Sequence, residues 1–138
     1  MTLTPFHLAI PVRDVAQAKA FYTEVIGCSV GRESEYWVDL NLFGHQLVCH
    51  EAEVKEASYN PVDGDAVPVP HFGVVLEMDS WRAFAERLQQ KGVAFIIEPK
   101  IRFQGLPGEQ ATMFFKDPSG NELEFKAFAD IETELFKT

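Results

Sequence analysis

The sequence predicts an α+β protein in which one strand–helix–strand–strand–strand (βαβββ) module occurs twice. Three pairs of like residues recur 64 or 65 positions apart: His7 and His71, Asp14 and Asp79, Gly27 and Gly92. Identity between the two halves is low, so the repeat lies in the order of elements. One module leaves a face of its sheet bare, and we therefore expect two modules to share a core.

The first module is expected over residues 1–58. Alternating polarity predicts a strand over 6–12. Asp14 follows as a helix N-cap with Gln17 at the capping-box position, and the apolar helical stripe ends at Gly27, a common C-terminal helix signal. Three more strands are expected over 28–34, 36–42 and 45–52, with a turn at 43–44.

A linker loop is expected over 59–69, because this acidic region carries Asn60-Pro61 and Asp63-Gly64, which are turn and loop signals. The second module is expected over 70–130. It would contain a strand over 71–78, a helix capped by Asp79 or Ser80 and closed by Gly92, and strands over 93–103, 111–115 and 121–128. The tail, 131–138, is expected to be a short helix.

Composition excludes several classes of protein. A chain of 138 residues with 46% hydrophobic residues is one domain, or two small halves with a common core. A net charge of −9 argues against binding to nucleic acid or to anionic membranes. The two cysteines form no CxxC pair, the N-terminal residues lack the pattern of a signal peptide, and no stretch is apolar enough to span a bilayer. We therefore expect a cytoplasmic protein.

Three polar residues stand out in the expected strands: His7, His71 and Glu124. Each lies in the phase opposite to the large apolar residues of its strand, so each faces away from the helices. Two imidazoles and a carboxylate suit a divalent transition metal with open coordination positions. Two other interpretations stay open: hydrogen-bonded structural histidines, and a plain ion pair between Glu124 and Lys126.

Four stretches make the chain resemble one known family: 6–14 (FHLAIPVRD), 20–22 (AFY) with 25–27 (VIG), 70–73 (PHFG) and 115–125 (FKDPSGNELEF). The most specific is an Asp-Pro-x-Gly turn with a Glu four residues after its Gly. The chain is identified as a member of the vicinal oxygen chelate superfamily, which includes glyoxalase I, extradiol dioxygenases and bleomycin-resistance proteins. The resemblance covers nearly the whole chain.

The resemblance implies a U-shaped half-barrel of two modules around a divalent metal such as Fe, Mn, Ni or Zn. It places the metal ligands at His7, His71 and Glu124. Many members have a fourth ligand on the last strand of the first module, and the equivalent position here is Val48, which cannot bind a metal. Either the site has three protein ligands, with Gln46 and His50 lining the cavity, or one of those two residues supplies the fourth.

Further candidates for the substrate pocket are aromatic or basic: Tyr36, Trp37, Arg102 and Phe114. Packing against a helix is the alternative role for the aromatic residues, and solvation at the surface is the alternative for Arg102. The resemblance also implies activity on a small oxygen-rich substrate, as a lyase, isomerase or dioxygenase. The other class is a metal-free binding protein of the bleomycin-resistance type. We expect a homodimer, and the sequence assigns no general base.

Several residues depart from the patterns of named activities. Phe114 stands where extradiol dioxygenases have a Tyr, and no His lies between His71 and Glu124 to act as their acid–base residue. Ala9 stands where fosfomycin-type transferases have a Thr. Glyoxalase-type isomerisation uses a carboxylate from the first module, where this chain has Val48 or Gln46. No named activity fits every position.

Overall fold

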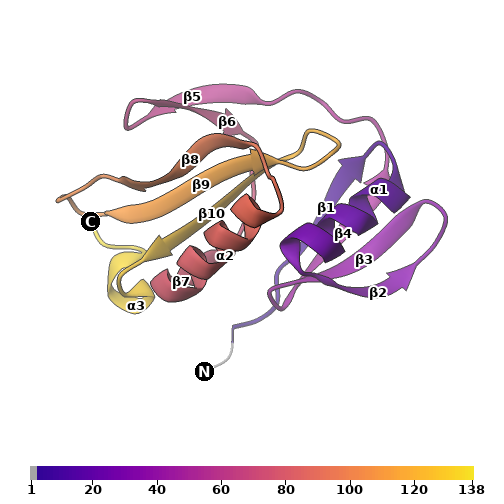
Figure 1. Ribbon diagram of the computed structural model, residues 1–138, viewed down its shortest axis with the longest axis horizontal. Coiled ribbons are helices and arrows are strands. Elements are labelled where there is room, and N and C mark those ends of the chain that lie inside the picture. Colours follow the sequence, from indigo (N-terminus) through magenta and orange to yellow (C-terminus); the bar gives the residue numbers. More distant parts are fainter. Residues whose placement is uncertain (1–2) are drawn as a thin grey trace. The chain divides into compact units, whose positions relative to one another are not determined.

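The computed structural model describes residues 3–138 and divides the chain into two compact units (Figure 1). The first unit runs to Glu56 and also contains the later segment Asp117–Asn121. The second comprises Ala57–Lys116 and Glu122–Thr138. Each unit has one four-stranded mixed sheet with a helix packed against it, which confirms the predicted α+β class and the repeated order of elements.

The first unit has the strand order β1-β4-β3-β2, with β1 parallel to β4 and the other neighbours antiparallel. Its elements are β1 (His7–Val12), α1 (Val15–Ala20), the π-helical turn η1 (Phe21–Ile26), β2 (Ser29–Glu33), β3 (Trp37–Leu42) and β4 (His45–Glu51). The Asp14 carboxylate accepts a hydrogen bond from the Gln17 N–H at 3.0 Å, and Gly27 ends the helix with φ 98°. Both predicted helix signals are confirmed.

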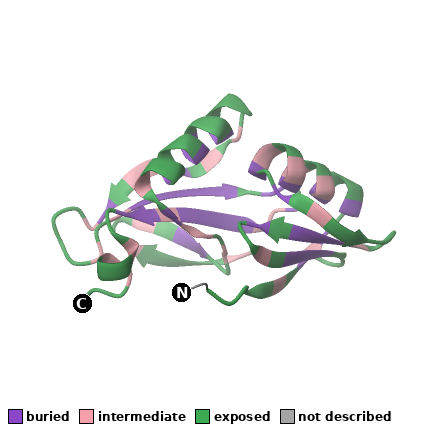
Figure 2. Cartoon of the chain, turned by 90° about the horizontal axis from the view of Figure 1, so that it is seen from below, coloured by how far each residue is buried: buried purple, intermediate pink, exposed green. Residues whose placement is uncertain are grey.

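The second unit has the strand order β7-β10-β9-β8, with β7 parallel to β10 and a separate hairpin of β5 and β6. Its elements are β5 (Ser58–Val62), β6 (Asp65–Val69), β7 (Val75–Glu77), α2 (Met78–Gln90), β8 (Phe95–Arg102), β9 (Gln110–Lys116), β10 (Glu122–Phe128) and α3 (Ile131–Glu134). The ring of Phe84 on α2 meets Phe125 of β10 edge-on, with centroids 4.7 Å apart. Figure 2 shows buried residues along the strands and exposed residues on the outer side of α2.

The expected linker loop over 59–69 is wrong, because these residues form the β5–β6 hairpin. The turn between the strands has two residues, Asp63 with φ 45° and Gly64 with φ 84°. Positive φ at both central positions is the geometry of a two-residue hairpin turn, for which Asp-Gly is a preferred sequence. The turn signal was therefore real, but it joins two strands.

Two boundaries in the second module also differ from expectation. The helix α2 begins at Met78, and its N-cap residue, Glu77, makes no side-chain capping hydrogen bond. Asp79 therefore lies in the first turn, where its negative charge interacts favourably with the helix dipole. The expected strand over 71–78 is reduced to β7 with an isolated parallel bridge between Phe72 and Leu123. Both pairings keep one register along β10, so His71 still lies beside that strand.

The Asp-Pro-Ser-Gly turn between β9 and β10 belongs to the first unit. The buried Tyr22 hydroxyl donates to Asp117 Oδ2 at 2.8 Å, and Asn121 Nδ2 donates to the Pro11 carbonyl at 2.7 Å. Burial and the nearby Asp117 carboxylate raise the pKa of Tyr22 well above its ordinary value, so the hydroxyl keeps its proton. These bonds anchor the turn within the first unit.

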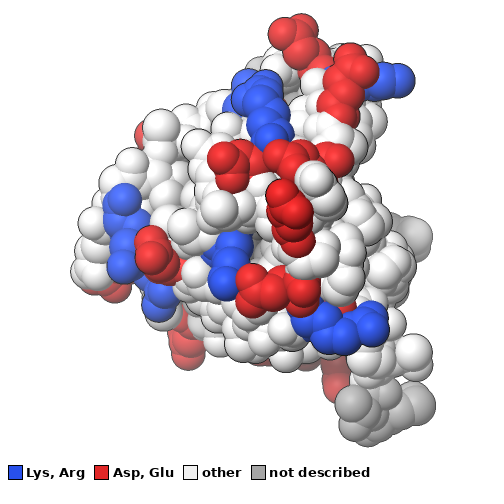
Figure 3. Space-filling view, turned by 90° about the vertical axis from the view of Figure 1, so that its right-hand side faces the viewer, with Lys and Arg blue, Asp and Glu red and all other residues white. Residues whose placement is uncertain are grey.

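The surface carries charges of both signs. On the face drawn in Figure 3, basic side chains lie among acidic ones and do not gather into a single patch. Among residues 3–138, no helix is long and apolar enough to cross a membrane.

Candidate functional site

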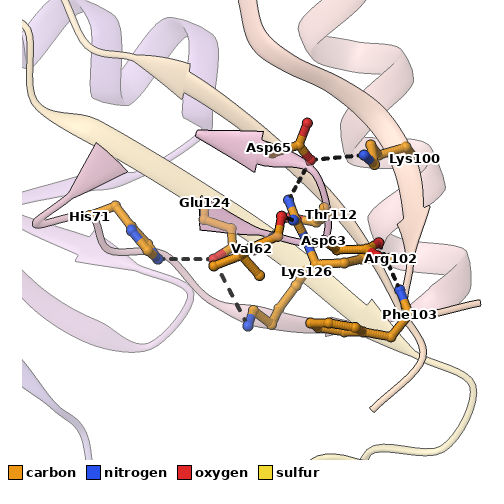
Figure 4. Close-up of polar contacts among 10 residues, drawn as sticks. All are labelled: Val62, Asp63, Asp65, His71, Lys100, Arg102, Phe103, Thr112, Glu124 and Lys126. Carbon is orange, nitrogen blue, oxygen red and sulfur yellow. Dashed lines mark hydrogen bonds and ion pairs between the residues drawn. The ribbon is translucent and has the colours of Figure 1, made fainter. Parts of the chain in front are cut away.

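His71 and Glu124 face each other in the second unit. His71 Nε2 lies 3.0 Å from Glu124 Oε1, and the Glu124 side chain is only 9% exposed (Figure 4). The backbone sets this approach: the Glu124 N–H donates to the Phe72 carbonyl at 2.8 Å, and the Phe72 N–H donates to the Glu122 carbonyl at 3.2 Å. The pair is thus built from two segments that are distant in the sequence.

Gly73 makes room for this pair. The parallel register that pairs Phe72 with Leu123 places Gly73 opposite Glu124, with His71 diagonal to it on the same face. A Cβ atom on Gly73 would lie 1.4 Å from the Glu124 carbonyl oxygen, so no other residue fits here without displacing the backbone. The close contact of the two chains requires glycine at this position.

Glu124 is held as a carboxylate. Thr112 Oγ1 donates to its Oε2 at 2.5 Å, and Lys126 Nζ lies 3.9 Å from its Oε1. Burial raises the pKa of Glu124, but hydrogen bonds from His71 and Thr112 together with the Lys126 charge outweigh burial and lower it below its ordinary value. Thr112 occupies one oxygen and leaves the other directed at His71.

His71 is oriented by the backbone. Its Nδ1 lies 2.6 Å from the Pro68 carbonyl oxygen. A carbonyl only accepts, so Nδ1 carries a proton and donates it, and Nε2 faces Glu124. The hydrogen bond with Glu124 raises the pKa of His71 above its ordinary value, against the opposing effect of burial. The edge of the His71 ring also contacts Phe114, with centroids 5.0 Å apart.

His7 has a similar arrangement within the first unit. It pairs with Gln46 across β1 and β4, and its Nδ1 lies 2.7 Å from Gln46 Oε1. The amide oxygen is an acceptor, so Nδ1 donates, and Nε2 takes no part in this bond. Gln46 is therefore a hydrogen-bond partner of His7. His50 lies four residues after Gln46 on β4, opposite Pro11. Four residues of a strand span about 13 Å, so His50 is far from His7.

The remaining candidates fall in different surroundings. Tyr36 is exposed, and Trp37 has the Arg32 guanidinium 5.9 Å from its ring centroid. Arg102 is buried at 3% exposure, and Phe114 is buried in the second sheet. Val48 is buried, as an apolar residue at that position should be.

Three contributors were missed by sequence reasoning: Gly73, the Pro68 carbonyl and Thr112. Thr112 lies two residues before Phe114 on β9, so the two side chains share one face of the sheet. Because Phe114 was already a pocket candidate, the strand periodicity alone could have identified Thr112 as a second one. Asp39 was missed as well. It is a nearly buried carboxylate that pairs with Val48 across β3 and β4 and lies 3.5 Å from Arg32 Nε.

Two imidazoles and a carboxylate are ligand types of a divalent transition metal. Both imidazoles have Nδ1 held by an acceptor, which is the usual outer-shell support of a metal-binding histidine. Within residues 3–138, no group of three or more His, Cys, Asp or Glu side chains is gathered as a metal cluster. His7 belongs to the first unit, whereas His71 and Glu124 belong to the second.

The fold, with its two βαβββ modules, defines a class of small proteins with many solved structures. A glyoxalase/bleomycin resistance protein/dioxygenase from Alicyclobacillus acidocaldarius is 36% identical over 94% of each chain, with a TM-score of 0.80. The fosfomycin resistance protein FosX from Listeria monocytogenes (19% identity, 93% and 95% coverage, TM-score 0.68) and a lactoylglutathione lyase from Agrobacterium tumefaciens (17%, 93% and 96%, 0.66) share the fold. No curated protein gives a significant match.

The family itself follows from the sequence match. The Glyoxalase/Bleomycin resistance protein/Dioxygenase superfamily matches residues 4–125. The chain belongs to this superfamily, as the motifs at 6–14 and 115–125 indicated.

Proposed function

We propose that the protein is a divalent-metal-dependent enzyme acting on a small oxygen-rich substrate, with His7, His71 and Glu124 as metal ligands. The observation that carries this proposal is the state of the two imidazoles. Gln46 and Pro68 each accept a hydrogen bond from Nδ1, so Nε2 of each ring lies outside that bond, and Nε2 of His71 already faces Glu124 Oε1 at 3.0 Å. Two imidazoles and a carboxylate suit Fe(II), Mn(II), Ni(II) or Zn(II).

The chemistry divides between the cation and the chain. When bound, a divalent cation would supply Lewis-acid stabilisation of negative charge on a substrate oxygen. Thr112 holds Glu124 Oε2 and so keeps Oε1 directed toward His71. Gln46 and the Pro68 carbonyl fix the orientation of the rings. This division supports a lyase, isomerase or dioxygenase acting by chelation.

We propose three protein ligands. Val48 cannot supply a fourth, Gln46 is already bonded to His7, and His50 lies too far along β4. With no fourth protein ligand, more coordination positions stay open to a substrate that binds through two oxygens.

Metal analysis tests the proposal. The wild-type protein, supplemented with each metal and then dialysed, should hold one equivalent by elemental analysis. His7→Ala, His71→Ala and Glu124→Ala should each lose it, whereas His50→Ala serves as a control that also removes one imidazole and should retain the metal. Gln46→Ala should weaken affinity about 10-fold, as loss of an outer-shell partner does.

Two results would contradict the proposal. If the wild type holds no stoichiometric metal after supplementation, the metal-free binding protein of the bleomycin-resistance type becomes the better description. If His50→Ala loses metal as completely as His7→Ala, the three-ligand arrangement is wrong.

We also propose a homodimer. Large apolar side chains are exposed near both ends of the chain: Phe136 is 89% exposed, Leu3 is 82% exposed and Phe6 is 64% exposed. A second copy of the chain would remove part of this apolar surface from water, which is favourable. Light scattering at micromolar concentration should give twice the mass of one chain, and a monomeric mass would contradict the proposal.

A further inference from the structure

A small cavity lies beside the His71–Glu124 pair, entirely within the second unit. Its volume is about 180 Å³. Its lining has an apolar part and a polar part. The apolar part consists of Val62, Val67, Phe103 and Phe114, and the polar part consists of His71, Arg102, Gln110, Glu124 and Lys126. Ligand pockets typically measure about 300–1,000 Å³, so this cavity suits one small group, such as a single ring or a branched chain.

The β5–β6 hairpin forms one wall of this cavity, and it is firmly attached. Asp65 lies 2.8 Å from Lys100 Nζ and 3.1 Å from Arg102, and Arg102 also donates to the Val62 carbonyl at 2.7 Å (Figure 4). Val67 packs in the core against Phe114. The cavity is therefore a built feature of the fold and does not arise from a loose loop.

Lys126 differs from the other cations around the hairpin. Arg102 and Lys100 are both engaged by Asp65 at short distance. Lys126 has Glu124 Oε1 as its ion-pair partner, at the longer distance of 3.9 Å, and that oxygen also faces His71. If Glu124 binds a metal, its charge is drawn to the cation, and the Lys126 ammonium at the cavity wall becomes available to another anion.

We infer that this cavity recognises the substrate: its apolar wall takes a ring or a branched chain, and Lys126 binds an anionic oxygen, such as a carboxylate, on the same molecule. The inference rests on the proposed function, because it places the substrate next to His71 and Glu124. It narrows the small oxygen-rich substrate to an organic anion with an apolar group. A buried or half-buried charge-assisted hydrogen bond discriminates strongly between an anion and its neutral isostere.

Benzoate and its neutral isostere benzamide are suitable probes. Zinc-loaded protein is titrated with each, and binding is followed by calorimetry and by shifts of backbone amide NMR signals. Benzoate should bind about 10-fold more tightly than benzamide. Lys126→Met should reduce this preference and leave benzamide binding unchanged, and Lys126→Arg should restore most of it. Signals of residues around Val62 and Phe103 should shift with both probes.

Lys91→Met is the matched control. Lys91 is an exposed residue at the end of α2 in the same unit, and it lines no part of the cavity. Its replacement removes the same charge, and benzoate affinity should change less than about 2-fold. Equal losses in Lys91→Met and Lys126→Met would show a general charge effect and overturn the inference.

Other outcomes separate this inference from the proposed function. If the wild type holds zinc but binds the two probes equally, or if benzoate binding is unchanged in Lys126→Met, the inference falls and the proposed function stands. If the wild type holds none of the four metals, the proposed function falls, and a Lys126-dependent preference for benzoate in metal-free protein would still support the inference. If neither probe shifts any signal at about 20 mM, where millimolar complexes are detectable, the inference is overturned.

Discussion

Gly73 lies against the backbone of Glu124, so that a methyl group on Gly73 would fall 1.4 Å from the Glu124 carbonyl oxygen. The backbone hydrogen bond from Glu124 to Phe72, at 2.8 Å, is made in the same place. The absence of a side chain therefore permits both the strand pairing and the diagonal approach of His71 to Glu124.

Gly73→Ala should be severely destabilising. The added methyl group must push β10 away from the segment that carries His71, and overpacking of this kind costs about 3 kcal/mol or more. Chemical denaturation should show a lower midpoint with an unchanged slope. Gly44→Ala is a control with no atom within 4 Å of the added Cβ, and its smaller cost should come from its φ of 90° alone. Equal losses in the two variants would refute the steric explanation.

Thr112→Val should lower both stability and metal affinity, because it removes the hydroxyl group but keeps the volume of the side chain. The buried Glu124 carboxylate would lose its 2.5 Å hydrogen bond, which costs about 2 kcal/mol for a charged acceptor. The pKa of Glu124 should rise, because a bond to the charged form is removed. Metal affinity should fall about 10-fold or more. Thr112→Ser keeps the hydroxyl and should retain affinity; if it fails like valine, the hydroxyl is not the cause.

The metal-free protein should show a pH-dependent contribution from His71 and Glu124. The hydrogen bond with Glu124 raises the pKa of His71 above 6.5, so its stabilisation is full below pH 6.5 and is lost as pH rises through the folded value. The pKa of Glu124 lies below 4.5. Burial raises this pKa, but the hydrogen bonds from His71 and Thr112 lower it by more than burial raises it. Its stabilisation is full above pH 4.5 and is lost as pH falls through the folded value.

The pair therefore stabilises most between pH 4.5 and pH 6.5. Urea unfolding with EDTA at about pH 5.5 and about pH 8 measures this contribution as the difference between wild type and His71→Gln. The difference should be larger at the lower pH. A difference that grows toward pH 8 would contradict the assignment of the proton to His71.

Tyr22→Phe should destabilise the first unit by about 1–2 kcal/mol, because a buried hydroxyl that donates to Asp117 at 2.8 Å is lost. Metal binding should weaken less than in Thr112→Val, since Tyr22 contacts the turn and not Glu124. Thermal unfolding measures the first effect and metal titration the second. An unchanged midpoint would show that this bond contributes nothing to stability.

The two thiols should be unreactive in the folded protein. Burial raises the pKa of Cys28 from 9.0 to about 11 and that of Cys49 from 9.0 to about 12. At about pH 8 the thiolate fraction is then about 100-fold lower for Cys28 and lower still for Cys49. A thiol reagent should label neither residue quickly in buffer and both in denaturant. Rapid labelling of one thiol in buffer would contradict its buried position.

Much of the fold was predictable because it depends on local signals and on the repeat. Asp14 and Gly27 delimit a helix through interactions within one or two turns, and the spacing of 64 to 65 residues transfers the same plan to the second half. The hairpin was missed because Pro61 and Pro68 interrupt the polarity pattern of β5 and β6. Proline is tolerated there because the hairpin is a two-stranded sheet with outward-facing edges.

The site was predictable only in part. The alternation of polarity marks which face a side chain occupies, and this was enough to select His7, His71 and Glu124. It does not give the register between strands, which decides that Gly73 lies opposite Glu124 and that Gln46 lies opposite His7. Partners across strands, such as Thr112 and the Pro68 carbonyl, depend on that register.

The turn Asp117–Asn121 determines where the chain can be cut into two fragments, because it belongs to the first unit although it lies in the second half of the sequence. A cut after Glu56, at the boundary of the repeat, would yield an N-terminal fragment lacking the carboxylate that receives the Tyr22 hydroxyl and the amide that bonds Pro11. Its complement would carry an unanchored turn before β10. Two separately expressed halves should therefore recover a native structure only when mixed. The first unit is therefore incomplete without these five residues from the second half of the sequence.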